Sequence, residues 1–62
     1  MYLYELTDYV RMFQSTYDSH CALYHSCIRH NDRDGELYYR GKADSLLEVL
    51  DFLRSCVDAA EA

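Results

Sequence analysis

The sequence predicts an all-α protein, an antiparallel two-helix hairpin of the coiled-coil type, and three observations support this. Apolar residues recur at steps of three and four in two long segments, which is the period of one face of a helix. The chain of 62 residues has no Pro and only two Gly, so it offers few residues suited to the turns of a multi-strand fold. One cluster of turn residues, 31–35, separates the two segments near the middle of the chain. We therefore expect a single domain over residues 1–62.

The first segment predicts a helix over about residues 5–30. Its apolar stripe continues to Cys27 at helical spacing, and Arg29 and His30 suit the negative end of the helix dipole. Four residues of this stripe are assigned to the core of an oligomer: Leu6, Val10, Phe13 and Tyr17.

The turn and the second helix follow. Residues 31–35 contain Asn, Asp and Gly, which tolerate left-handed backbone or bond their own main chain. Asp32 or Asp34 can cap a second helix, predicted over about residues 36–59, and Glu36 favours its first turn. Four residues of its stripe are assigned to the same core: Leu46, Leu50, Leu53 and Val57.

Two such helices joined by a loop of about four residues must pack antiparallel. Each apolar stripe is wider than the seam that one partner helix covers, because Tyr9, Met12, Val49 and Phe52 lie at its edges. A lone hairpin would leave these side chains wet. We therefore expect the chain to be its own partner, with two hairpins forming a homodimeric four-helix bundle.

Composition excludes several classes of protein. Half of the residues are apolar and 27% are charged, with a net charge of −5. This chain is too apolar for a disordered acidic tail, and its charges interrupt any membrane span of about 20 residues. No signal peptide is visible at the start, so a cytoplasmic location is the expectation.

No pattern in the sequence predicts an enzyme, a catalytic residue or a cofactor. Three Cys and three His raise a zinc-binding bundle as one alternative, with Cys21 and His25 at one helical spacing and Cys27 and His30 at another. The two pairs point in different directions, so no metal site is predicted. Disulfides within the chain are excluded, because Cys56 lies roughly 34 Å from the turn and Cys21 roughly 18 Å from it, whereas a bridge needs Cα atoms within about 7 Å.

Charges are unevenly placed along the predicted hairpin. Residues 25–44, at the loop end, carry four bases and four acids, so the net charge of −5 belongs to the open end. Aromatic rings interleaved with acids at the open end predict a surface for another protein. Its residues are Tyr2, Tyr4, Asp8, Tyr9, Asp51 and Asp58. The alternative site at the loop end would take an acidic partner or nucleic acid, and consists of Arg29, Arg33, Tyr38, Arg40 and Lys42.

The stretch from Gly35 to Leu50, GELYYRGKADSLLEVL, resembles the second helix of small helical-hairpin accessory proteins of bacteriophages and mobile elements. The resemblance covers about a quarter of the chain and rests on a YY-x-G-K-A start before a Leu-rich run. It implies a non-enzymatic inhibitor or adaptor that binds a host protein. Components of antiviral defence are among the host proteins that such hairpins bind. Two alternative functions remain. One is a small nucleic-acid-associated regulator that uses the basic loop end, although the acidic chain disfavours nucleic acid. The other is the zinc-binding bundle.

Overall fold

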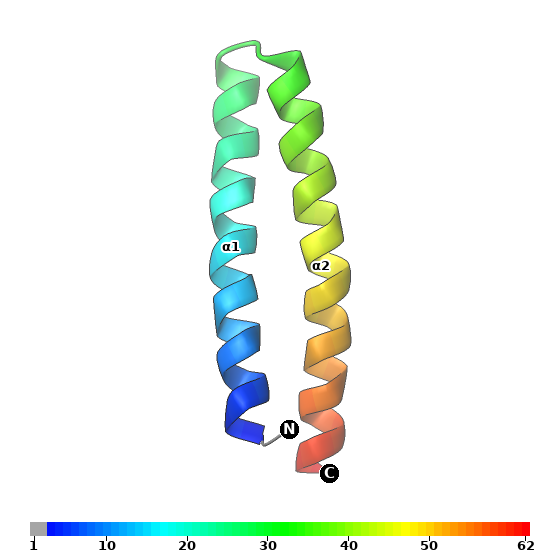
Figure 1. The fold of residues 1–62 in the computed structure, drawn as a ribbon. Helices are drawn as coiled ribbons and strands as arrows, with labels where there is room; N and C mark the ends of the chain where they lie inside the picture. Colours follow the sequence, from blue (N-terminus) through cyan, green and yellow to red (C-terminus); the bar gives the residue numbers. More distant parts are fainter. Residues whose placement is uncertain (1–2) are drawn as a thin grey trace.

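The computed structural model describes residues 3–62, and they form two long antiparallel helices. Helix α1 spans Leu3–Arg29 and α2 spans Arg33–Glu61. The helices lie side by side along a rod with extents of 45 × 14 × 14 Å, joined by one short loop (Figure 1). The predicted all-α helical hairpin is confirmed.

A single apolar seam holds the two helices together. All eight residues assigned to the core are buried or half-buried, but Leu50 alone among them is fully shielded from solvent. Ala43, also on α2, is 8% exposed, and it is the only other buried residue in the described part of the chain. The hairpin thus has a line of contact rather than an enclosed core.

The loop ends α1 with a left-handed residue. Asn31 has a φ of 57°, a conformation that Asn tolerates better than most residues. The Asp32 amide donates to the Cys27 carbonyl at 2.8 Å, and the Asn31 amide donates to the Ile28 carbonyl at 3.2 Å. This is the Schellman arrangement, which satisfies carbonyls that the end of a helix would otherwise leave unpaired.

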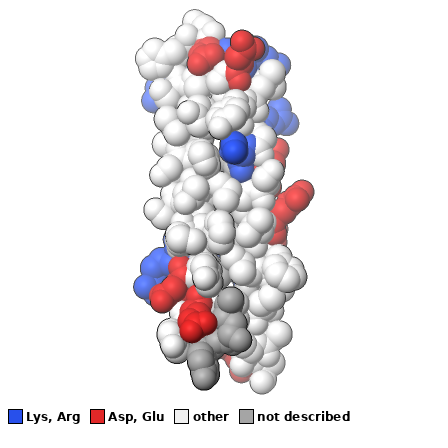
Figure 2. Space-filling view, in the orientation of Figure 1, with Lys and Arg blue, Asp and Glu red and all other residues white. Residues whose placement is uncertain are grey.

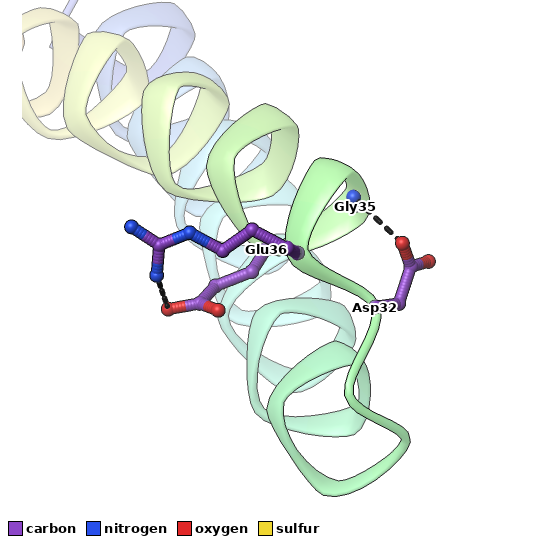
Figure 3. A network of polar contacts seen from close by, with 4 residues as sticks. Asp32, Gly35 and Glu36 are labelled. Carbon is purple, nitrogen blue, oxygen red and sulfur yellow. Dashed lines mark hydrogen bonds and ion pairs between the residues drawn. The ribbon is translucent and has the colours of Figure 1, made fainter.

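Asp32 is also the N-cap of α2. Its Oδ1 accepts a hydrogen bond from the Gly35 amide at 3.0 Å, and Arg33 forms an ion pair with Glu36 at 3.4 Å one turn further on (Figure 3). Residues 33–35 are consequently helical, and the predicted turn over 31–35 was too long. The reason is that one residue both completes the end of α1 and caps α2.

The outer helix ends also extend beyond the predicted bounds. Helix α1 begins at Leu3 rather than near residue 5, and α2 continues to Glu61 rather than to about 59. At the second of these ends, Ala and Glu are strong helix formers, and the Ala62 amide donates to the Asp58 carbonyl at 3.1 Å.

The two glycines should respond in opposite ways to replacement by Ala. A Cβ at Gly41 meets nothing within 4 Å, so Gly41→Ala should raise the free energy of unfolding by about 0.5–1 kcal/mol by lowering the chain entropy of the unfolded state. A Cβ at Gly35 would lie 2.5 Å from Asp32 Oδ2 and 2.7 Å from Cys27 Sγ. Gly35→Ala should therefore lower it by about 1 kcal/mol or more. Urea denaturation at one protein concentration measures both, and a stabilising Gly35→Ala would contradict this account of the turn.

Candidate functional site

The surface beside the seam has two sides. The seam residues are Leu6, Val10, Phe13, Tyr17, His20, Tyr24 and Cys27 of α1 and Tyr39, Ala43, Leu46, Leu50, Leu53 and Val57 of α2. A helix turns about 100° per residue, so residues that directly precede a seam residue lie on one side of the seam and those that directly follow lie on the other. In an antiparallel hairpin the preceding residues of both helices share a side. Arg54 follows Leu53, Gln14 follows Phe13, and the Arg54 guanidinium donates to the Gln14 side-chain oxygen across the helices, as this geometry requires.

The side formed by the preceding residues is almost free of charge, and we call it the apolar side. Glu5 and Lys42 are the only Asp, Glu, Lys or Arg residues at its directly preceding positions within the described chain, and Asp8 borders it beside Glu5, Tyr9 and Met12. Its large side chains are well exposed, with Phe52 at 67% and Met12 at 52%. In Figure 2, most charged groups lie at the ends and edges of the visible face, one blue group lies near the middle of its upper half, and the rest of the middle is uncharged. The large exposed apolar residues of the apolar side are Tyr9, Met12, Leu23, Tyr38, Val49 and Phe52.

The opposite side, which we call the charged side, has a different character. Shallow depressions run along it, one lined by Gln14, Asp18 and Arg54 and another by Cys21, Arg40 and Asp44. Its charged residues are Arg11, Asp18, Arg40, Asp44, Asp51, Arg54 and Asp58.

The structure splits the predicted open-end site between the two sides. Asp8 and Tyr9 line one depression together with Glu5 and Met12, whereas Asp58 lines another with Thr7 and Arg54. The carboxylates of Asp8, Asp51 and Asp58 are exposed, as is Tyr4, and Asp8 pairs with Arg11 at 3.8 Å. Tyr2 lies outside the described residues. Acidic side chains and aromatic rings are therefore both present at the open end, but they are distributed around the hairpin and do not form one patch.

The alternative loop-end site is divided in the same way. Lys42 Nζ lies 5.5 Å from the centre of the Tyr38 ring on the apolar side, whereas Arg40 lies on the charged side. Arg33 is engaged with Glu36, and Arg29 is exposed at the end of α1. Lys42 and Arg40 therefore lie on different sides of the hairpin.

A small aromatic cluster packs across the seam near the loop end. The His20 ring of α1 stacks on Tyr39 of α2, with centroids 5.7 Å apart and planes at 30°. The rings of Tyr38 and Tyr39 pack edge to face, with centroids 5.0 Å apart. His20 Nδ1 is shielded from solvent and has no hydrogen-bond partner among the described residues. His20 is thus a packing residue of the seam.

The three cysteines are free and half-buried. Within residues 3–62, no group of three or more His, Cys, Asp or Glu side chains is placed to hold a metal ion, so the geometry names no zinc ligands. Side-chain hydrogen bonding with Cys21 is the largest cause that raises the pKa of Tyr17. Burial, and next the carboxylate of Asp32 with its Oδ2 3.9 Å from the sulfur, raise the pKa of the Cys27 thiol.

This pKa shift predicts how the Cys27 thiol reacts. In a Cys21→Ser, Cys56→Ser background, alkylation of Cys27 should need a higher pH than alkylation of an ordinary thiol, because the thiolate is the reactive form. Asp32→Asn keeps a good helix cap but removes the nearby negative charge, so the midpoint of the rate against pH should move down. Asp34→Asn is the matched control and should leave the midpoint in place. Equal midpoints in all three proteins would show that Asp32 has no influence on the thiol.

Comparison with known proteins adds no relative from which a site could be transferred. No protein family, no curated protein and no solved structure matches the chain. Neither α1 nor α2 has an apolar stretch long enough to cross a lipid bilayer. The candidate functional surfaces are therefore those that the hairpin itself presents.

Proposed function

We propose that this chain is a non-enzymatic protein-interaction module, a helical hairpin that pairs with a second copy into a four-helix bundle and in that form binds another protein. The observation that carries the proposal is the apolar surface that the hairpin leaves exposed. Large side chains such as Phe52 and Met12 remain mostly in solvent, while only Ala43 and Leu50 of residues 3–62 are buried. Exposed apolar surface of this extent is typical of proteins that associate.

The surface area supports the same proposal. The hairpin exposes 4643 Å², whereas a compact monomer of 7.3 kDa exposes about 4,200 Å². A chain of this size gains little net stability from one seam, because the burial of apolar area barely exceeds the cost in conformational entropy. A second hairpin would cover apolar side chains that the first cannot cover.

The role of the module as an inhibitor or adaptor rests on the resemblance of residues 35–50 to the accessory hairpins of phages and mobile elements. Binding to a host protein would use exposed acids of the open end, where Asp8, Asp51 and Asp58 are all solvated. Such charges mainly speed and orient an encounter, and aromatic rings supply affinity. Three free thiols accord with our placement of the protein in the reducing cytoplasm.

Coupling of folding to self-association can be measured directly. Light scattering at micromolar concentration should give at least twice 7.3 kDa. Leu50→Asp should abolish the helical circular-dichroism signal, because Leu50 is 0% exposed and an unpaired buried charge costs several kcal/mol. Ser55→Asp, at an exposed position of the same helix, is the control and should keep both mass and helicity. A stable, fully helical monomer would remove the self-pairing part of the proposal.

Capture of a host protein tests the second part. The immobilised chain should retain a protein from a lysate of its natural host. Replacing Asp8, Asp51 and Asp58 together by Lys should slow this capture and weaken its salt dependence without unfolding the hairpin, because all three side chains are exposed. The matched comparison is Arg29→Glu with Arg40→Glu at the loop end. Loss of capture in that variant alone would assign binding to the loop end instead.

A further inference from the structure

We propose that the apolar side of the hairpin receives a second copy of this chain that runs antiparallel to the first, with the loop end of each copy beside the open end of the other. This inference rests on the self-pairing part of the proposed function and specifies the face and the direction of the pairing. It comes from three features: the difference between the two sides of the seam, the area available, and the placement of charged and aromatic residues along α2.

Desolvation of the apolar side costs little free energy. Pairing through it would desolvate the neighbourhood of Glu5, Asp8 and Lys42. Pairing through the charged side would desolvate seven ionised residues, which is expensive unless each is paired. One small polar side chain on the apolar side already uses its hydroxyl. Thr16 donates to the Met12 carbonyl at 3.1 Å. Covering Thr16 therefore leaves its hydroxyl with an acceptor.

The area of this side is sufficient for a stable pair. The hairpin extends 45 Å along its axis and 14 Å across it. A flat rectangle of that size covers about 630 Å², so two copies would bury about 1,300 Å² in total, which lies within the range of specific interfaces. Phe52, Met12 and Val49 would supply the large apolar groups at its centre.

The placement of residues along α2 favours the antiparallel direction. Leu47 is the middle residue of α2, and Phe52 and Lys42 lie at equal distances on either side of it. With the two-fold axis at that level, Phe52 of one copy is level with Lys42 of the second copy. The Lys42 ammonium already lies 5.5 Å from the centre of the Tyr38 ring, so this cation and ring form a ready site for a further aromatic side chain. Phe52 is 67% exposed, more than any other large apolar residue described, so it would bury the most surface by packing there.

Net charge favours the same direction. The loop-end segment, residues 25–44, is neutral, and the remainder of the chain carries the net charge of −5. A parallel pair would place two acidic ends side by side, within about one Debye length of 8 Å at physiological salt. An antiparallel pair places each acidic end beside a neutral one. The same reversal keeps Lys42 away from the level of its counterpart in the second copy.

Two variants with the same exposure test the face. Val49 on the apolar side and Leu47 on the charged side are both 39% exposed and lie two residues apart. Val49→Lys should raise the dissociation constant of the dimer by more than about 100-fold, because it puts a charge into the interface, whereas Leu47→Lys should leave it within about threefold. Phe52→Lys should act like Val49→Lys, and because Phe52 is 67% exposed, the substitution removes little packing within the hairpin itself. A dimer that tolerates both apolar-side variants but is disrupted by Leu47→Lys overturns the assignment.

Distance measurement tests the direction. A nitroxide on Ala59→Cys, in a chain whose three native cysteines are replaced by Ala, labels the open end of each copy. Because α2 rises about 1.5 Å per residue, antiparallel pairing should separate the two labels by roughly 35 Å or more, and parallel pairing by less than roughly 20 Å. A short distance in a stable dimer overturns the antiparallel arrangement and leaves the proposed function standing. A monomer at all concentrations overturns both, and host-protein capture by that monomer would preserve only the interaction role.

Discussion

Two helices can share only one seam, and this constraint governs the rest of the structure. Each helix covers a single stripe of its neighbour, so a chain in which half the residues are apolar must leave many of them outside. Leu50 and Ala43 are the described residues that the seam shields well. The residues directly beside the seam are sorted into an apolar side and a charged side by the rotation of the helix alone. The apolar surface left exposed is therefore a property of the pattern rather than of any one site.

The loop achieves the antiparallel arrangement with very few residues. Asn31 supplies the left-handed turn, and Asp32 bonds backward to Cys27 through its amide and forward to Gly35 through its carboxylate. Gly35 is required because these two side chains, Asp32 and Cys27, crowd the position where a Cβ would sit. The turn therefore fixes both the length of the connection and the register in which the seam residues meet.

The sequence was sufficient to predict the two helices and the seam, because a period of three and four that persists over about 25 residues is characteristic of a long amphipathic helix. It was less informative about the turn, since Asp32 and Asp34 are both good caps and only the packed geometry shows that Asp32 also bonds to Cys27. The candidate sites were predicted by position along the chain. The structure distributes Tyr9 and Asp58 to different sides of the hairpin, because neighbours at one end of a helix can point in opposite directions.

The compact loop also has a consequence for the order in which the chain folds. Once residues 27–35 have closed, His20 and Tyr39 are separated by a short effective loop, and Gln14 and Arg54 follow further out. Each contact lowers the closure entropy of the next, so the helices can zip together from the loop toward the open end. A sequence of this kind avoids closing the long loop between Gln14 and Arg54 in one step. We therefore expect changes in the loop to alter the rate of folding and changes at the open end to alter mainly the rate of unfolding.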